Sequence, residues 1–217
     1  MINQADKPNF LASSWKAIYV VLAVIYLLMM ERLSFPYSAI VKALPIGYLL
    51  LTCFMTISRL NIKLCLALMF SAFGDVLLAS PIELSFELGL GSFLIAHIFY
   101  IWIFIRKRGK LSQYKNQLFV LGLYCVSMAA FILPLTEQLF LPVAVYMLTI
   151  TIMGISAVLF QGSSLVKLGA ISFILSDSFI AIERFHGAFE GSGLVIMSTY
   201  YLAQLLITVG VIKENQQ

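Results

Sequence analysis

The chain alternates between long apolar runs and short polar connections along most of its length. Most of these runs reach the roughly 17–25 residues that a helix needs to cross a bilayer. The connections are too short to hold an inserted soluble domain. The pattern therefore predicts an all-α, polytopic transmembrane bundle of about eight helices, with residues 1–217 forming a single integral membrane domain. The predicted spans are roughly 16–31, 37–56, 63–79, 88–105, 116–133, 140–158, 165–183 and 193–212.

Composition supports a membrane protein and excludes a water-soluble enzyme of this size. Hydrophobic residues make up 61% of the 217 residues and charged residues only 11%, whereas a soluble domain carries roughly 25% charged residues. A soluble fold of this length has too little interior to bury so much apolar surface.

The basic residues predict the orientation of the bundle. Of the 14 Lys and Arg residues, only Arg32, Lys42 and Arg184 lie away from the side that carries both termini. Because basic residues accumulate in cytoplasmic loops, both termini are expected to be cytoplasmic. This bias explains the net charge of +4 without a nucleic-acid partner. Short loops and the lack of a retention signal favour a bacterial cytoplasmic membrane.

Two carboxylates stand inside apolar runs. Asp75 lies in FSAFGDVLLA (70–79) and Asp177 in FILSDSFIA (173–181), each directly after a small residue. A charged residue at the centre of a span costs about 2.5–3.5 kcal/mol on insertion scales, so such residues usually carry function. Both aspartates lie about twelve residues into their spans, which corresponds to roughly 18 Å of helix. We therefore interpret them as the centre of the site.

Other polar residues fall in the same layer of the bundle. They come from the second, fourth and eighth spans and are Lys42, His97, Tyr100, Tyr200 and Gln204. Tyr200 and Gln204 are four residues apart and share one helix face. Polar residues of five spans thus meet in the outer half of the predicted bundle.

Each of these polar residues has more than one interpretation, and at least one of them is purely structural. The aspartates could bridge helices as neutral acids, form an ion- or proton-coupled transport site, or act as a catalytic acid–base pair. Two neighbouring carboxyl groups push their pKa values apart, which supplies the acid and the base of general acid chemistry. Lys42 could reach outward to the interface. His97 could be a packing residue, and Tyr200 and Gln204 could form interhelical hydrogen bonds.

Motifs of soluble enzymes are absent from the sequence. It contains no G-x-S-x-G, H-E-x-x-H, P-loop or dinucleotide-binding pattern. Two histidines, with cysteines confined to apolar segments, make a zinc site improbable. No metal site is expected.

Five stretches resemble the YhhN-like lysoplasmalogenase family. They are KALPI (42–46), FSAFGDVLL (70–78), G-x-x-S-F-L-I-A-H-I-F-Y (89–100), GAISFILSDSFIAIERF (169–185) and YYLAQLLI (200–207). Members of this family are eight-helix membrane hydrolases that cleave the vinyl ether bond of lysoplasmalogens. Their products are a fatty aldehyde and glycerophosphoethanolamine or glycerophosphocholine. The resemblance implies a lysophospholipid substrate taken from the lipid bilayer and no metal or organic cofactor.

The resemblance also suggests roles for the polar layer. A vinyl ether is hydrolysed through an oxocarbenium ion, and glycosidases handle a related cation with two carboxyl groups. We expect Asp75 and Asp177 to share the acid and base roles. Lys42, with His97, Tyr100, Tyr200 and Gln204, would bind the head group or a water. The alternatives are a small proton- or ion-coupled transporter and a non-catalytic lipid-binding bundle.

Overall fold

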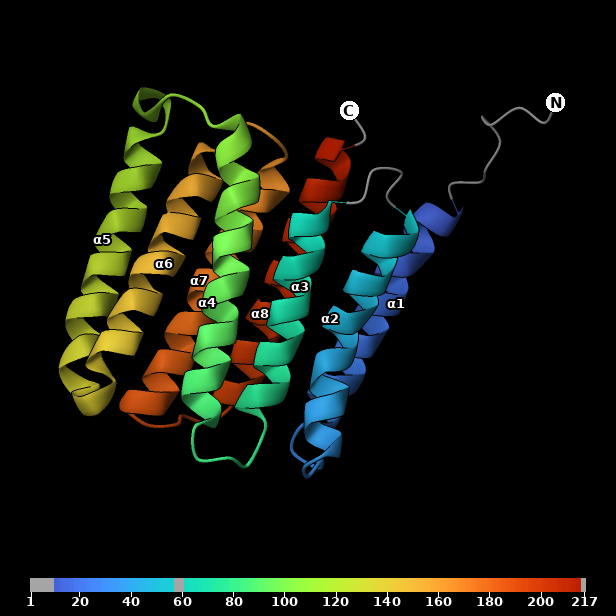
Figure 1. Ribbon diagram of the computed structural model, residues 1–217, viewed down its shortest axis with the longest axis vertical. Coiled ribbons are helices and arrows are strands. Elements are labelled where there is room, and N and C mark those ends of the chain that lie inside the picture. The colour runs from blue at the N-terminus through green and yellow to red at the C-terminus, as the bar shows by residue number, and fades with distance from the viewer. Residues whose placement is uncertain (1–9, 57–60, 216–217) are drawn as a thin grey trace.

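A computed structural model describes residues 10–56 and 61–215, and this part of the chain folds into eight α-helices (Figure 1). The predicted all-α architecture is confirmed. The helices are α1 (Phe10–Met29), α2 (Tyr37–Thr56), α3 (Ile62–Leu78), α4 (Ser85–Phe104), α5 (Lys115–Ile132), α6 (Phe140–Leu159), α7 (Ser164–Phe185) and α8 (Ser192–Asn215). Short 3-10 turns extend the ends of α4 and α5 and precede α5 and α6: η2 (Ile105–Lys107), η3 (Leu111–Gln113), η4 (Leu133–Leu135) and η5 (Glu137–Leu139).

Within the described residues, six helices are long and apolar enough to cross a membrane. They are α2, α4, α5, α6, α7 and α8. The apolar stretch of α1 is shorter, Ser14–Met29, and α3 has 17 residues. These lengths agree with the expectation of an integral membrane protein.

The two aspartate-bearing helices lie in the middle of the bundle. α3 packs most closely on α4, and α7 packs most closely on α8, while α2 covers α3 and α6 lies against α4. α1 and α5 lie at opposite edges (Figure 1). Asp75 on α3 and Asp177 on α7 are therefore surrounded by other helices.

Glycines allow these two helix pairs to approach closely. A Cβ added at Gly169 of α7 would lie 2.9 Å from the backbone nitrogen of Ile207 on α8. A Cβ at Gly74, the neighbour of Asp75, would lie 2.6 Å from the ring of Phe93 on α4. Small residues at such positions let membrane helices pack backbone to backbone. The small residue beside Asp75 therefore has a packing role.

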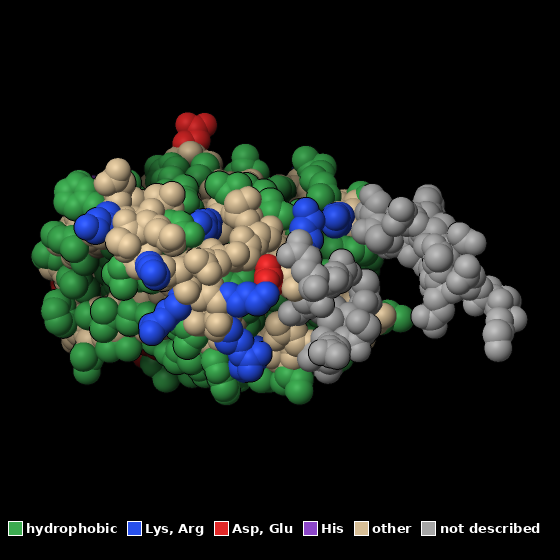
Figure 2. All heavy atoms as spheres, turned by 90° about the horizontal axis from the view of Figure 1, so that it is seen from above, with side chains coloured by type: hydrophobic (Ala, Val, Ile, Leu, Met, Phe, Trp, Pro, Cys, Tyr) green, Lys and Arg blue, Asp and Glu red, His purple; other side chains and the backbone are tan. Residues whose placement is uncertain are grey.

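Basic side chains collect at one end of the bundle. Figure 2 shows this end, where α4 and α8 finish and α5 and α7 begin, with many Lys and Arg side chains. The loop after α4 is fixed to the loop after α6, because Arg108 pairs with Phe160 as an isolated β-bridge. Lys107 forms an ion pair with Glu214 of α8. We call this end the basic face; Lys7 and Arg59, which were also assigned to it, lie outside the described residues.

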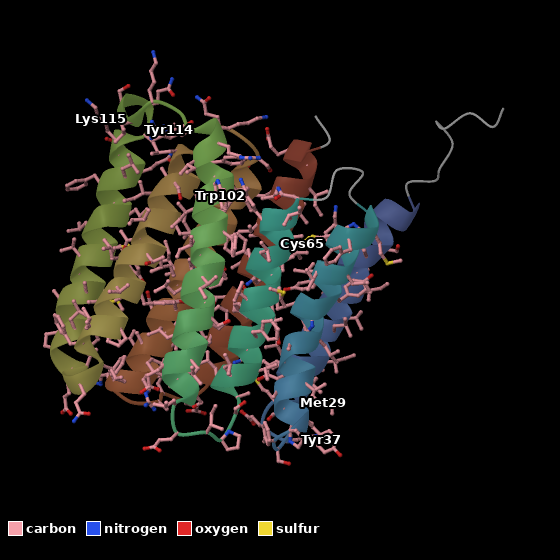
Figure 3. The ribbon with its side chains drawn as sticks, in the orientation of Figure 1. Met29, Tyr37, Cys65, Trp102, Tyr114 and Lys115 are labelled. Atoms are coloured by element: carbon pink, nitrogen blue, oxygen red, sulfur yellow. The ribbon has the colours of Figure 1, made fainter. Side chains whose placement is uncertain are left out.

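Aromatic residues mark both ends of the bundle. Trp102 lies on α4 toward the basic face and Tyr37 at the start of α2, at the opposite end (Figure 3). Trp102 is half exposed, and the Lys63 ammonium lies 3.8 Å from the centre of its ring. Exposed aromatic rings of this kind anchor helices at membrane–water interfaces.

Candidate active site

Asp75 is held between three helices. Its side chain is almost fully buried, and Oδ2 accepts a 2.7 Å hydrogen bond from the Tyr200 hydroxyl of α8. Oδ1 lies 3.8 Å from the Lys42 ammonium of α2. The structure thus brings together three residues that were assigned to the site from the sequence.

Asp177 has a different set of partners. Its Oδ2 accepts a 2.5 Å hydrogen bond from the hydroxyl of Tyr146 on α6 and lies 3.9 Å from Nε2 of His97. Tyr146 was not among the site residues predicted from the sequence. It lies six residues after the start of α6, at a depth comparable with that of the other polar residues, and this depth is the signal that could have identified it.

His97 faces Asp177 with an unpartnered nitrogen. Its Nδ1 lies 2.6 Å from the carbonyl oxygen of Phe93. Because a carbonyl only accepts, this contact assigns the proton to Nδ1 in the neutral ring. Nε2 is buried and has no hydrogen-bond partner among the described residues. It is therefore available to a water or to a small shift of Asp177.

Tyr100 and Gln204 bond to each other and to neither aspartate. The Tyr100 hydroxyl donates a 2.6 Å hydrogen bond to Oε1 of Gln204. Neither residue lines the pocket, described below, whose wall includes both aspartates. This arrangement agrees with the interhelical hydrogen bonding that the sequence left open for Gln204.

Both aspartates line one pocket, which we call the polar pocket. Its volume is about 520 Å³, and its wall includes Lys42, Asp75, Asp177 and Tyr200. Glu183 and Arg184 from the end of α7 and Ala188 from the following loop also belong to this wall, so the pocket lies toward the end of the bundle opposite the basic face.

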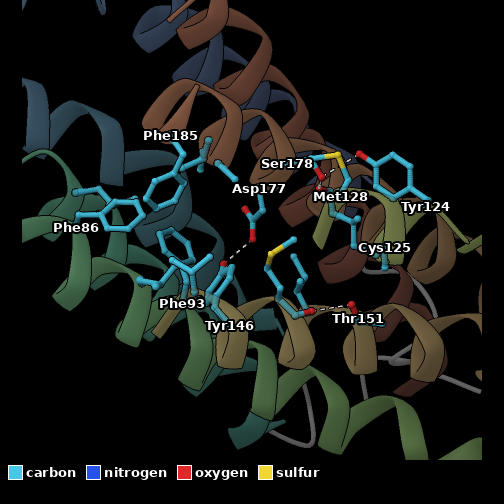
Figure 4. A pocket seen from close by; sticks show the side chains of 18 residues that line it. Phe86, Phe93, Tyr124, Cys125, Met128, Tyr146, Thr151, Asp177, Ser178 and Phe185 are labelled. Carbon is cyan, nitrogen blue, oxygen red and sulfur yellow. Dashed lines mark hydrogen bonds between the residues drawn. The ribbon is translucent and has the colours of Figure 1, made fainter. Parts of the chain in front are cut away.

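A second, apolar cavity meets the polar pocket at Asp177. We call it the apolar slot; Figure 4 shows Asp177 bonded to Tyr146 among aromatic and methionine side chains. α4, α5, α6 and α7 form most of its wall, and its volume is about 70 Å³. Phe93 and Asp177 line both spaces. The site therefore joins a charged compartment to a narrow apolar one.

Three aromatic rings pack against one another beside these compartments. The rings of Phe93, Phe173 and Tyr200 pack edge to face, with centroid separations of 5.6–6.3 Å. They come from α4, α7 and α8, and such contacts fix ring orientation. Tyr200 is thereby oriented toward Asp75.

The described residues include no group of three or more His, Cys, Asp or Glu side chains arranged to hold a metal ion. The chemistry available from the described side chains is that of carboxyl, phenol, imidazole and ammonium groups. An amphiphile fits the arrangement best, because one end of the site is charged and the other apolar.

Comparisons with known proteins identify a family and several relatives that are similar to the chain. Residues 37–211 match the YhhN family. The chain is 32% identical over 151 residues to a protein of Mycobacterium tuberculosis named lysoplasmalogenase, covering 66% of this chain and 58% of the relative. It therefore spans less than two thirds of the mycobacterial relative's length.

Mammalian proteins show a similar degree of identity. Lysoplasmalogenase TMEM86B of Rattus norvegicus is 32% identical over 213 residues, which cover 92% of this chain and 84% of the relative. The human protein of the same name is 35% identical over 150 residues, covering 68% and 62%. No solved structure matches the chain.

Proposed function

Because the chain belongs to the YhhN family, we propose that it hydrolyses the vinyl ether bond of a lysoplasmalogen. The products are a fatty aldehyde and glycerophosphoethanolamine or glycerophosphocholine. Relatives named lysoplasmalogenase support this reaction. The structural observation that carries the proposal is that Asp177 lines both the polar pocket and the apolar slot. The vinyl ether joins the glycerol head to the hydrocarbon tail, so the scissile bond belongs at that boundary.

In the proposed reaction, a carboxylic acid first protonates the β-carbon of the vinyl ether. The double-bond electrons form the new C–H bond, leaving an oxocarbenium ion at the α-carbon. Water adds to the α-carbon and loses a proton to a base. The resulting hemiacetal breaks its bond to the glycerol oxygen, giving the aldehyde and a glycerol hydroxyl group. One water is consumed, and the catalytic proton is returned.

The pocket geometry supports a division of the two roles. The β-carbon lies on the tail side of the ether oxygen, and Asp177 borders the apolar slot, so we assign proton donation to Asp177. Asp75 lies in the polar pocket beside the Lys42 ammonium. As an ion-paired carboxylate it would receive the proton of the attacking water. His97, with its free Nε2 toward Asp177, would help return the proton.

Charges in the polar pocket suit a zwitterionic head group. Lys42 and Arg184 supply two cations for the phosphate, and Glu183 supplies an anion for the amine. The Arg184 guanidinium lies 4.8 Å from the centre of the Phe86 ring, which holds it at the pocket wall. A lysophospholipid would thus place its head in the polar pocket and the first part of its tail in the slot.

We further propose that the whole chain is one integral membrane domain with both termini in the cytoplasm of a bacterium. The polar pocket would then open toward the outer half of the membrane. This orientation rests on the basic face and the positive-inside rule.

Aldehyde release by purified protein tests the proposal. The substrate is lysoplasmenylethanolamine, and the matched control is the same lipid with a saturated ether bond. We expect aldehyde from the vinyl ether alone, and its loss in Asp177→Asn and in Asp75→Asn. If the wild type releases aldehyde and either folded variant keeps full activity, the two-carboxyl mechanism is wrong. No turnover by well-folded wild type, with gradient-dependent flux instead, would favour a transporter; lipid binding alone would favour a non-catalytic bundle.

A further inference from the structure

A second apolar groove lies next to the slot, nearer the basic face. Its volume is about 490 Å³, and α5 and α7 contribute most of its wall, including Val120, Leu121, Ile171 and Leu175. Lys167 lies at its end near the basic face, together with Asn116 and Gln117. We call it the second groove; none of the steps of the proposed reaction involves it.

Two side chains separate the slot from the second groove. Tyr124 of α5 and Ile174 of α7 line both spaces. The Tyr124 hydroxyl donates a 2.9 Å hydrogen bond to Ser178 Oγ, beside Asp177. Figure 4 shows this bond at one side of the slot. A single neutral hydrogen bond, worth roughly 1 kcal/mol net, therefore holds the Tyr124 ring across the boundary.

α5, which forms one wall of both spaces, makes few contacts with the bundle. Only Leu121 and Ile132 of its residues are buried, and it lies at the edge of the molecule (Figure 1). Segments with little buried apolar contact open at low free energy. The boundary at Tyr124 can thus adjust without disturbing α3, α4, α7 and α8.

Distances along α7 relate these spaces to the length of a lipid tail. From Asp177 toward the basic face, the slot reaches Ile174, whereas the second groove continues to Lys167. Three residues of helix span about 4.5 Å and ten residues span about 15 Å. One leaflet of a bilayer core of about 30 Å is also about 15 Å thick. A full-length tail bound at Asp177 and directed toward the basic face therefore needs both spaces.

We infer that the second groove receives the distal part of the substrate's hydrocarbon tail, and that Tyr124 and Ile174 at its entrance select the chain length. The inference rests on the proposed function, because it takes the vinyl ether at Asp177 as the starting point. Short tails end within the slot. Long tails displace the Tyr124 ring and continue between α5 and α7.

Binding of uncleavable lipids tests the inference separately from turnover. The probes are saturated 1-O-alkyl lysophosphatidylethanolamines with four-carbon and eighteen-carbon tails, titrated into detergent-solubilised wild type, Ile171→Trp and Leu168→Trp. Ile171 lines the second groove; Leu168, on the same helix, is also exposed but does not line it. Because the larger indole ring occupies space in the groove that the tail would fill, Ile171→Trp should bind the long-tailed probe about tenfold more weakly. Its affinity for the short-tailed probe, and both affinities of Leu168→Trp, should match wild type.

A third variant tests the boundary itself. Tyr124→Ala removes the ring and joins the two spaces, so its preference for the long-tailed over the short-tailed probe should increase. If Ile171→Trp weakens both probes equally, weakens neither, or behaves like Leu168→Trp, the tail does not occupy the second groove and the inference is wrong. Absence of binding by wild type would overturn it as well. Aldehyde release, measured on the same preparations, reports on the proposed function independently.

Discussion

Tyr146 on α6 donates its hydroxyl hydrogen to Asp177 on α7 across 2.5 Å, in the same way that Tyr200 on α8 donates to Asp75 on α3. Each aspartate thus has one tyrosine partner from another helix. A second polar group faces each carboxyl, His97 for Asp177 and Lys42 for Asp75. The two carboxyl groups therefore occupy chemically different surroundings in one pocket, as the proposed acid and base roles require.

Removing the tyrosine hydroxyl beside Asp177 should slow the reaction. Asp177 gains negative charge as it donates its proton, and a hydrogen bond to a charged group contributes about 1.5–3 kcal/mol. Tyr146→Phe should therefore lower kcat by about 10- to 100-fold. Tyr37→Phe is the matched control, because Tyr37 is an exposed ring at the start of α2. Its kcat should equal that of wild type. Steady-state aldehyde release measures both. Equal activity of Tyr146→Phe and wild type would show that this bond does not orient the acid.

Loss of the cation at the pocket wall should affect substrate binding more than chemistry. Arg184→Gln should raise KM about tenfold, equivalent to about 1.4 kcal/mol, with little change in kcat, because the phosphate is remote from the scissile bond. Arg32→Gln removes a charge outside the polar pocket and serves as the control. Lysoplasmenylethanolamine titrations give both constants. A fall in kcat without a change in KM would assign Arg184 to another step.

Close packing of α7 on α8 should make Gly169 sensitive to substitution. The Cβ of Gly169→Ala would press on the backbone of Ile207, and overpacking destabilises by about 1–3 kcal/mol. Gly122→Ala on α5 has no atom within 4 Å of the new Cβ and should stay within about 1 kcal/mol of wild type. Thermal unfolding in detergent compares them. Equal midpoints for the two variants would contradict the close α7–α8 contact.

The proposed orientation predicts which loops are accessible from each side. With Cys53, Cys65 and Cys125 replaced by Ala, a membrane-impermeant maleimide added outside intact spheroplasts should label Glu83→Cys but not Ser112→Cys. Inverted vesicles should give the opposite pattern, since Ser112 lies on the basic face. Labelling of Ser112→Cys from outside would reverse the topology while leaving the fold unchanged.

The sequence by itself was sufficient to predict the helices and to single out the two carboxyl groups as site candidates. Hydropathy is a local property, so each apolar run predicted one helix, although α1 begins at Phe10 rather than near residue 16. A charged residue in an apolar run can also be recognised from the sequence, because burying it in a membrane costs free energy however the helix packs. Asp75 and Asp177 therefore needed no tertiary information.

The tertiary structure decided which side chains meet. Tyr146 was missed because a tyrosine in an apolar span is common, and only the packing of α6 against α7 places its hydroxyl on Asp177. Tyr100 and Gln204 share the predicted layer but turn toward each other. Depth along a helix follows from counting residues, whereas the direction of each face follows from helix packing. For this reason only the tertiary structure separated the polar pocket from the apolar slot.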